Sequence, residues 1–127
     1  MGVSDLTEKI IGAAMAVHQE LGPGLLESTY EACMAFELVE RGLSVDRQKP
    51  LPVVYRHVRI DCGYRIDLLV EDLVIVELKA VAELRPIHEA QVLSNLKLCG
   101  RHVGLLINFN VKLFKSGIRR LVNELSE

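Results

Sequence analysis

Residues 64–80, YRIDLLVEDLVIVELKA, contain two apolar segments, Tyr64–Val70 and Leu73–Ala80, separated by Glu71 and Asp72. Short segments rich in Val, Ile and Leu are typical of β-strands, and the two acidic residues between them are typical of a turn. We therefore predict two consecutive strands that pair as an antiparallel hairpin.

The apolar residues on both sides of this hairpin recur with helical or strand-like spacing. The predicted helices, each followed by a glycine, are Leu6–Leu21, Leu26–Arg41 and Pro86–Cys99. The first should begin with a capping box, Asp5-x-x-Glu8. Further predicted strands are Leu51–Ile60, the buried Val103–Phe109 and, as a short edge strand or a helix, Ile118–Val122. The resulting order is ααββββαβ, an α/β (α+β) fold with a central mixed sheet flanked by helices.

The composition predicts one domain over residues 1–127, because 127 residues with 50% hydrophobic content can build one core and leave no room for a second. Aromatic residues make up only 5% of the chain and Trp is absent, so a protein that reads RNA bases by stacking is not expected. The cysteines are far apart and lack the paired spacing of a zinc site or a disulfide framework; they are Cys33, Cys62 and Cys99.

The sequence predicts a cytoplasmic location without a membrane partner, since it has no signal-peptide pattern and no apolar stretch long enough to span a bilayer. Charge is distributed unevenly, although the net charge is only -2. Residues 1–40 hold seven acids and one base, whereas the remainder holds ten acids and fourteen bases, Arg65 among them. This distribution is compatible with a basic, phosphate-binding surface on the C-terminal part.

Three charged side chains lie within the apolar hairpin: Asp67 on the first strand, and Glu77 and Lys79 on the second. Residues two apart on a strand point to the same face, so Glu77 and Lys79 project together. A three-residue loop, or a bulge, between the strands places Asp67 directly across from Glu77, whereas a two-residue loop places them on opposite faces.

Two neighbouring carboxylates repel each other, and a hard cation such as Mg²⁺ relieves that repulsion through oxygen coordination. A lysine beside them holds the attacking water or stabilises the charge on a phosphate. Asp67 followed by Glu77-x-Lys79 is therefore compatible with a phosphodiester-cleaving site. An ordinary ion pair between Lys79 and either carboxylate explains the same three charges.

The sequence resembles the GxxExxY proteins of the PD-(D/E)XK nuclease superfamily. The motifs that carry the resemblance span most of the chain; they are Gly24-Leu25-Leu26-Glu27-Ser28-Thr29-Tyr30, Tyr64–Val70, Val76–Ala80, His88-Glu89-Ala90-Gln91 and Gly104–Phe109. The resemblance implies a restriction-endonuclease-like core of helix, three antiparallel strands, helix and strand.

The resemblance also implies a role for each matching residue. Asp67 and Glu77 would bind the metal, and Lys79 would act as catalytic base or stabilise charge. Glu27 would add a third carboxylate to the metal site, and Gln91 would orient a water or a phosphate. Related RecB-like nucleases often have a Tyr four residues after this Gln, where the present chain has Asn95.

Two further residues are expected to contact substrate: Tyr30, which would hydrogen-bond Glu27 or a phosphate, and Arg65, a base near the site. The function that best fits these residues is an Mg²⁺-dependent nuclease acting on nucleic acid, with DNA favoured as substrate and Mn²⁺ as the alternative ion. A non-catalytic module that binds nucleic acid or protein on the same fold remains open, as does a phosphohydrolase of another class. The sequence also leaves the oligomeric state open, a homodimer included.

Overall fold

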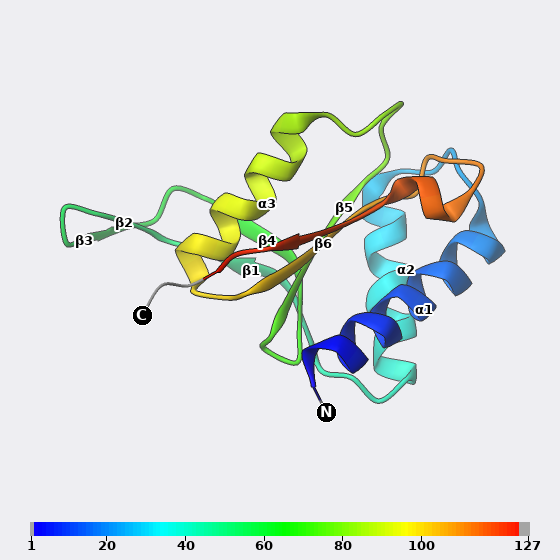
Figure 1. The fold of residues 1–127 in the computed structure, drawn as a ribbon, viewed down its shortest axis with the longest axis horizontal. Coiled ribbons are helices and arrows are strands. Elements are labelled where there is room, and N and C mark those ends of the chain that lie inside the picture. The colour runs from blue at the N-terminus through cyan, green and yellow to red at the C-terminus, as the bar shows by residue number, and fades with distance from the viewer. Residues whose placement is uncertain (1, 125–127) are drawn as a thin grey trace.

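The computed structural model describes residues 2–124, which form a five-stranded mixed sheet with helices on both faces (Figure 1). The helices are α1 (Val3–Leu21), α2 (Glu27–Glu40), α3 (Pro86–Cys99) and a short 3₁₀ helix (Phe114–Gly117). The strands are β1 (Val45–Pro50), β2 (Val53–Tyr55), β3 (Val58–Ile60), β4 (Arg65–Val70), β5 (Val74–Lys79), β6 (Val103–Asn108) and β7 (Ile118–Val122). The strand order is β1-β4-β5-β6-β7, and β2 and β3 form a separate sheet. The predicted fold class is confirmed.

The central strand β5 separates two hydrophobic clusters. Val74, Val76 and Leu78 pack with residues of α1 and α2, whereas Ile75 packs with residues of α3. Strand β5 pairs in parallel with β6, and all other pairs in this sheet are antiparallel. Every residue of β6 is buried, as expected for a parallel strand covered on both faces. Helix α3 therefore covers one face of the strand that carries Glu77 and Lys79.

The turn between β4 and β5 contains an extra residue. The Leu73 amide donates a hydrogen bond to the Val70 carbonyl at 3.0 Å, which closes a turn over Glu71 and Asp72, both with positive φ. Pairing begins at Val70 and Val74, so Leu73 is bulged out of the ladder. This is the longer connection that the sequence required for Asp67 to face Glu77.

Three details of the predicted secondary structure are wrong. Leu51–Ile60 is not one strand: β2 and β3 form a hairpin that turns at Arg56 and His57, residues that do not signal a turn in sequence. The strand β1 comes before it and lacks a clear apolar alternation, so five strands precede α3 where the predicted order had four. Helix α1 begins at Val3 after an extended Gly2, without the predicted capping box.

Tyr30 fixes the connection between α1 and α2. Its side chain is fully buried and stacks on Phe109, with ring centroids 4.6 Å apart. Its hydroxyl donates a hydrogen bond to the Gly22 carbonyl at 2.5 Å and accepts one from the Leu25 amide at 3.1 Å. The tyrosine therefore joins the turn before α2 to the core.

We predict that Tyr30→Phe lowers the free energy of unfolding by about 1–2 kcal/mol, because the partly buried Gly22 carbonyl and Leu25 amide lose their partner. Urea denaturation measures this difference. Tyr64→Phe, at a residue that is 46% exposed, is the control and should change stability by less than about 0.5 kcal/mol. Equal effects of the two substitutions would show that the hydroxyl of Tyr30 does not stabilise the fold.

Candidate functional site

Asp67 and Glu77 lie opposite each other on β4 and β5. The register that pairs Leu68 with Val76 continues by one residue to bring them together. The Asp67 amide donates a hydrogen bond to Glu77 Oε2 at 3.1 Å, and the Leu78 amide donates one to Asp67 Oδ2 at 2.9 Å. Each carboxylate thus satisfies a backbone donor of the other strand. The predicted juxtaposition of Asp67 and Glu77 is confirmed.

Burial makes this pair costly to ionise. The pKa of Glu77 is raised to about 8, first by desolvation and then by the negative charge of Asp67. Desolvation also raises the pKa of Asp67, which the hydrogen bond from the Leu78 amide partly offsets. The positive charge of Lys79 lowers the pKa of both carboxyl groups, but by less than burial raises it. A proton on Glu77 or a cation at the pair relieves the repulsion.

Glu31 of α2 and Gln48 of β1 extend the site. The Gln48 side-chain amide donates to Glu31 Oε1 at 2.5 Å and to Asp67 Oδ1 at 3.2 Å. The negative charge of Glu31 contributes to the raised pKa of both Asp67 and Glu77. Gln48 therefore holds a third carboxylate close to the pair.

Gln48 occupies an unusual backbone position. Arg47 pairs with Leu68 and Lys49 with Ile66, so Gln48 comes opposite Asp67 between them, but it is not part of the ladder and its φ is 50°. Positive φ is uncommon for a residue other than Gly and often marks a functional site. Regular pairing of β4 is thus interrupted at Asp67 on both sides.

Sequence reasoning missed Glu31 and Gln48. Glu31 lies four residues after Glu27, on the same face of α2 one turn further on, so the helical period was a signal for it. Gln48 gave no such signal, because its contact with Asp67 depends on how β1 pairs with β4.

The structure does not bring the remaining predicted site residues into contact with the pair. Glu27 is exposed at the first turn of α2, and Gln91 is exposed on α3; among residues 2–124 neither forms a hydrogen bond or ion pair. Arg65 is exposed, and its guanidinium donates to the Tyr64 carbonyl at 2.9 Å. Tyr30 is buried in the core. The functional roles assigned to these four residues stay predictions.

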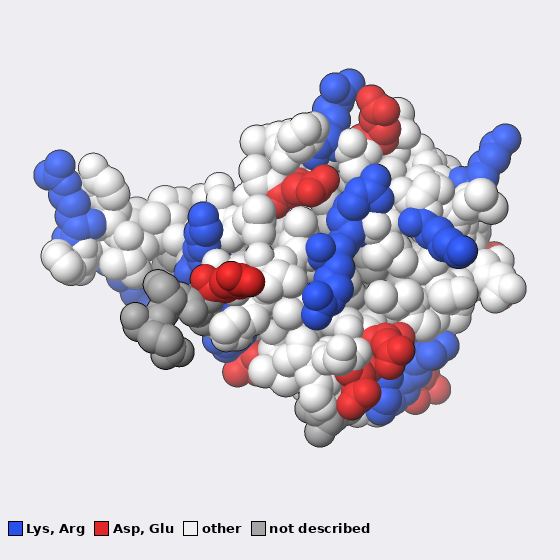
Figure 2. All heavy atoms as spheres, viewed as in Figure 1, with Lys and Arg blue, Asp and Glu red and all other residues white. Residues whose placement is uncertain are grey.

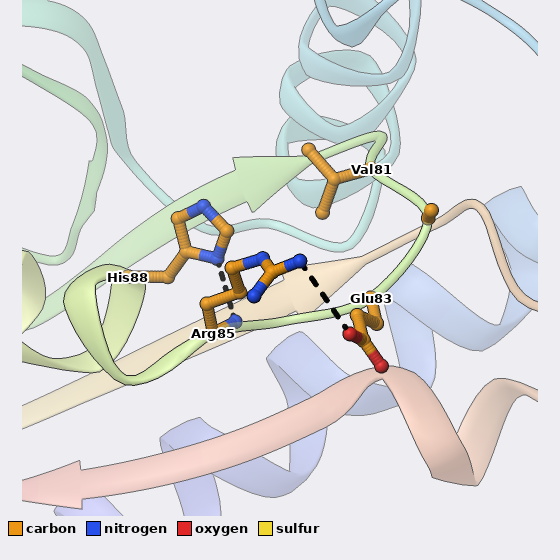
Figure 3. A pocket seen from close by; sticks show the side chains of 5 residues that line it. Val81, Glu83, Arg85 and His88 are labelled. Carbon is orange, nitrogen blue, oxygen red and sulfur yellow. Dashed lines mark hydrogen bonds and ion pairs between the residues drawn. The ribbon is translucent and has the colours of Figure 1, made fainter.

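A hollow of about 400 Å³ opens where the chain leaves β5 and enters α3; it is lined by Val81, Ala82, Glu83, Arg85 and His88. Figure 3 shows the Arg85 guanidinium directed at Glu83, 3.8 Å from its carboxylate, and the Arg85 amide bonded to His88 Nδ1 at 2.9 Å. The side chain of Asn108 holds the amide and the carbonyl of Val81, at 3.0 and 2.9 Å. Val81 comes two residues after Lys79, so the hollow begins beside the strand end that carries the lysine.

The donor set fits a magnesium ion. Mg²⁺ is usually bound by one or two carboxylates and keeps several waters, and Asp67 and Glu77 supply two carboxylates that repel each other without a cation. Within the described part of the chain, no three His, Cys, Asp or Glu side chains are grouped closely enough to hold a metal ion by themselves. Water or substrate would therefore complete the coordination, and the predicted set that adds Glu27 is not assembled.

A family model described as the PD-(D/E)XK nuclease superfamily matches residues 4–121. No curated protein and no solved structure gives a significant match to the chain. In residues 2–124, every helix is too short or too polar to cross a membrane.

We predict that Glu77 makes stability depend on pH in the absence of divalent ions. Because its pKa rises from 4.5 to about 8 on folding, the folded state binds more protons than the unfolded state between these values. The free energy of unfolding should therefore fall as pH increases from about 5 to about 8, by up to about 1 kcal/mol per pH unit. Urea denaturation in chelator across this range measures the slope.

Glu77→Gln should remove most of this slope, because the amide does not ionise. Glu40→Gln, at an exposed position on α2, is the matched control and should keep it. If the free energy of unfolding of Glu77→Gln depended on pH as steeply as that of the wild type, another group would be responsible for the pH dependence.

Proposed function

The chain belongs to the PD-(D/E)XK nuclease superfamily, and on that premise we propose that it is an Mg²⁺-dependent nuclease that hydrolyses DNA phosphodiester bonds at Asp67 and Glu77. The observation that carries the proposal is the pair itself: two desolvated carboxylates face each other across β4 and β5. Placing a charged pair inside a sheet costs stability unless a ligand neutralises it. Membership of the GxxExxY group within the superfamily is part of the same proposal.

In this mechanism Asp67 and Glu77 hold Mg²⁺, with Mn²⁺ as the alternative. The ion, when bound, makes water more acidic and attracts the phosphate oxygens. Lys79 lies two residues after Glu77 on the same strand face, where its ammonium group holds the attacking water or stabilises the charge that develops on the phosphate.

Glu31 and Gln48 act through Asp67 in this proposal. The Gln48 amide binds Asp67 Oδ1 and the Leu78 amide binds Oδ2, so both oxygens of Asp67 have a fixed direction. Fixing a metal-binding carboxylate from its outer side typically affects metal affinity or activity by 10- to 100-fold in other proteins, as an order of magnitude. Gln48 is therefore a positioning residue.

The other predicted residues form no hydrogen bond with Asp67 or Glu77 among residues 2–124. Arg65 and Gln91 have exposed side chains that a substrate can reach, and Glu27 lies one helical turn before Glu31. Tyr30 has both hydrogen-bonding positions of its hydroxyl in use within the fold, which supports a structural role over substrate binding.

A non-catalytic binding module on the same fold is the second candidate. The observation that favours it is the acidic character of residues 1–40, seven acids against one base, which does not attract nucleic acid. Salt-sensitive DNA binding without cleavage would identify this alternative, and binding to a protein without affinity for DNA would be another form of it.

We predict that Asp67→Asn and Lys79→Met each lower Mg²⁺-dependent DNA cleavage by about 100-fold or more while the protein stays folded. Purified variants are incubated with single-stranded, duplex and branched DNA, with Mg²⁺ or with chelator. Asp5→Asn and Lys9→Met on α1 remove the same groups from exposed positions and should cleave like wild type. Equal cleavage by wild type and both site variants would reveal a contaminating nuclease.

We also predict that Gln48→Gly lowers the cleavage rate by about 10-fold or more without loss of stability. Glycine relieves the positive φ of residue 48 and removes the amide that joins Glu31 to Asp67. Thermal denaturation and a titration of rate against Mg²⁺ concentration measure the two effects. A variant with normal activity at all Mg²⁺ concentrations would exclude a positioning role for the Gln48 side chain.

A further inference from the structure

The β2–β3 hairpin extends from the body of the protein as a separate two-stranded sheet (Figure 1). Its two strands pair at three positions: Val53 lies opposite Ile60 at the base, and Tyr55 lies opposite Val58 at the tip. Val54, Tyr55 and Val58 are each more than half exposed. An isolated two-stranded hairpin is marginally stable in water, and a bound partner would stabilise this one.

The turn at the tip of the hairpin has a strained backbone. Arg56 and His57 have φ values of 50° and 67° in a two-residue turn. Such turns favour Asn-Gly, because most side chains are unfavourable at positive φ. The Arg and His side chains at the tip are thus kept although they destabilise the turn. Residues held in unfavourable backbone conformations are often found at functional sites.

The charge of this region is positive although the protein is acidic overall. From Arg47 to Ile60 the chain holds four Lys or Arg residues and no acid, while the net charge of the protein is -2. Among the described residues, Arg56, Arg59 and Lys49 are exposed and form no ion pair. On the face drawn in Figure 2, Lys and Arg, and no Asp or Glu, are visible at the outer end formed by the hairpin. A polyanion is the partner that this charge fits.

The hairpin is also close to the carboxylate pair along the chain. Strands β1 and β4 lead into and out of it, and they carry Gln48 and Asp67. Asp67 is the third residue of β4, so it lies near the end of the strand that the hairpin adjoins. A nucleic acid bound at Asp67 would therefore lie near the strand ends from which the hairpin extends.

We propose that the β2–β3 hairpin is an arm that binds the backbone of double-stranded nucleic acid held at the carboxylate pair. This inference deepens the proposed function and rests on it. A two-stranded ribbon has a width that the major groove of a duplex admits. Single-strand binding would need a series of stacking aromatics, and the ribbon offers one, Tyr55, with the Arg56 guanidinium 5.5 Å from its ring centre.

The variant Arg56→Asn/His57→Gly separates binding from stability. Asn-Gly fits the turn better than Arg-His, so thermal denaturation should show an unchanged or higher midpoint. Affinity for a 20-base-pair DNA duplex, measured by fluorescence anisotropy in chelator at low salt, should fall by about 3- to 10-fold. The slope of log affinity against log salt should decrease by about 1. Lys9→Asn, which removes one positive charge from α1, is the matched control.

The proposal would be overturned if Arg56→Asn/His57→Gly bound the duplex as tightly as the wild type. It would also be overturned if the wild type did not bind the duplex, or bound a single strand of equal length more tightly. A second copy of the chain would cover the ribbon instead if two results were obtained together. Light scattering would show that Tyr55→Ser/Val58→Thr abolishes self-association, and the duplex affinity of Arg56→Asn/His57→Gly would be unchanged. Duplex binding that depends on Arg56 and His57 without Mg²⁺-dependent cleavage would support the arm and contradict the proposed catalysis.

Discussion

The candidate site is organised around one unfavourable contact, the two carboxylates of Asp67 and Glu77, which face each other across β4 and β5. Backbone donors from the opposite strand make this contact tolerable, since the amides of Asp67 and Leu78 bind the two side chains. The same exchange ends regular pairing between β4 and β5 after Leu68 and Val76. Two backbone amides of the sheet thereby bind carboxylates instead of carbonyl groups. These hydrogen bonds do not remove the repulsion between the two negative charges, which a proton or a cation can neutralise.

This contact is set by a turn at the far end of the same two strands. Because side chains alternate along a strand, the bulge at Leu73 decides that Glu77, and not Val76 or Leu78, faces Asp67. Contacts from elsewhere hold the turn: the Ser44 amide and hydroxyl donate to the Glu71 carboxylate, and Arg101 donates to the carboxylate and carbonyl of Asp72. The geometry of the candidate site is therefore maintained from the opposite end of the hairpin.

The secondary structure elements that were predicted correctly are those marked in the sequence by apolar segments or by residues that begin and end helices. Strands β4, β5 and β6 are dominated by buried Val, Ile and Leu, and helix α3 begins at Pro86 and ends before Gly100, so the positions of these elements followed from the sequence. Strand β1 is mostly exposed, and the β2–β3 turn is formed by Arg and His, so neither gave a periodic or turn signal. The same limit applied to the site. The contact between Asp67 and Glu77 was predicted from the alternation of side chains along two consecutive strands. Gln48 reaches Asp67 only because β1 pairs with β4, and no short stretch of sequence indicates that pairing.

The acidic net charge does not by itself oppose binding to nucleic acid, because the charge is not uniform along the chain. Seven acids belong to residues 1–40, which form α1 and α2 on one face of the sheet, whereas residues 47–60 contain no acid. The field that a phosphate meets is set by the groups within roughly 10 Å at moderate salt, not by the sum over the chain. In the proposed mechanism, a divalent ion bound at Asp67 and Glu77 would reduce the repulsion between these carboxylates and a phosphate that approaches Lys79.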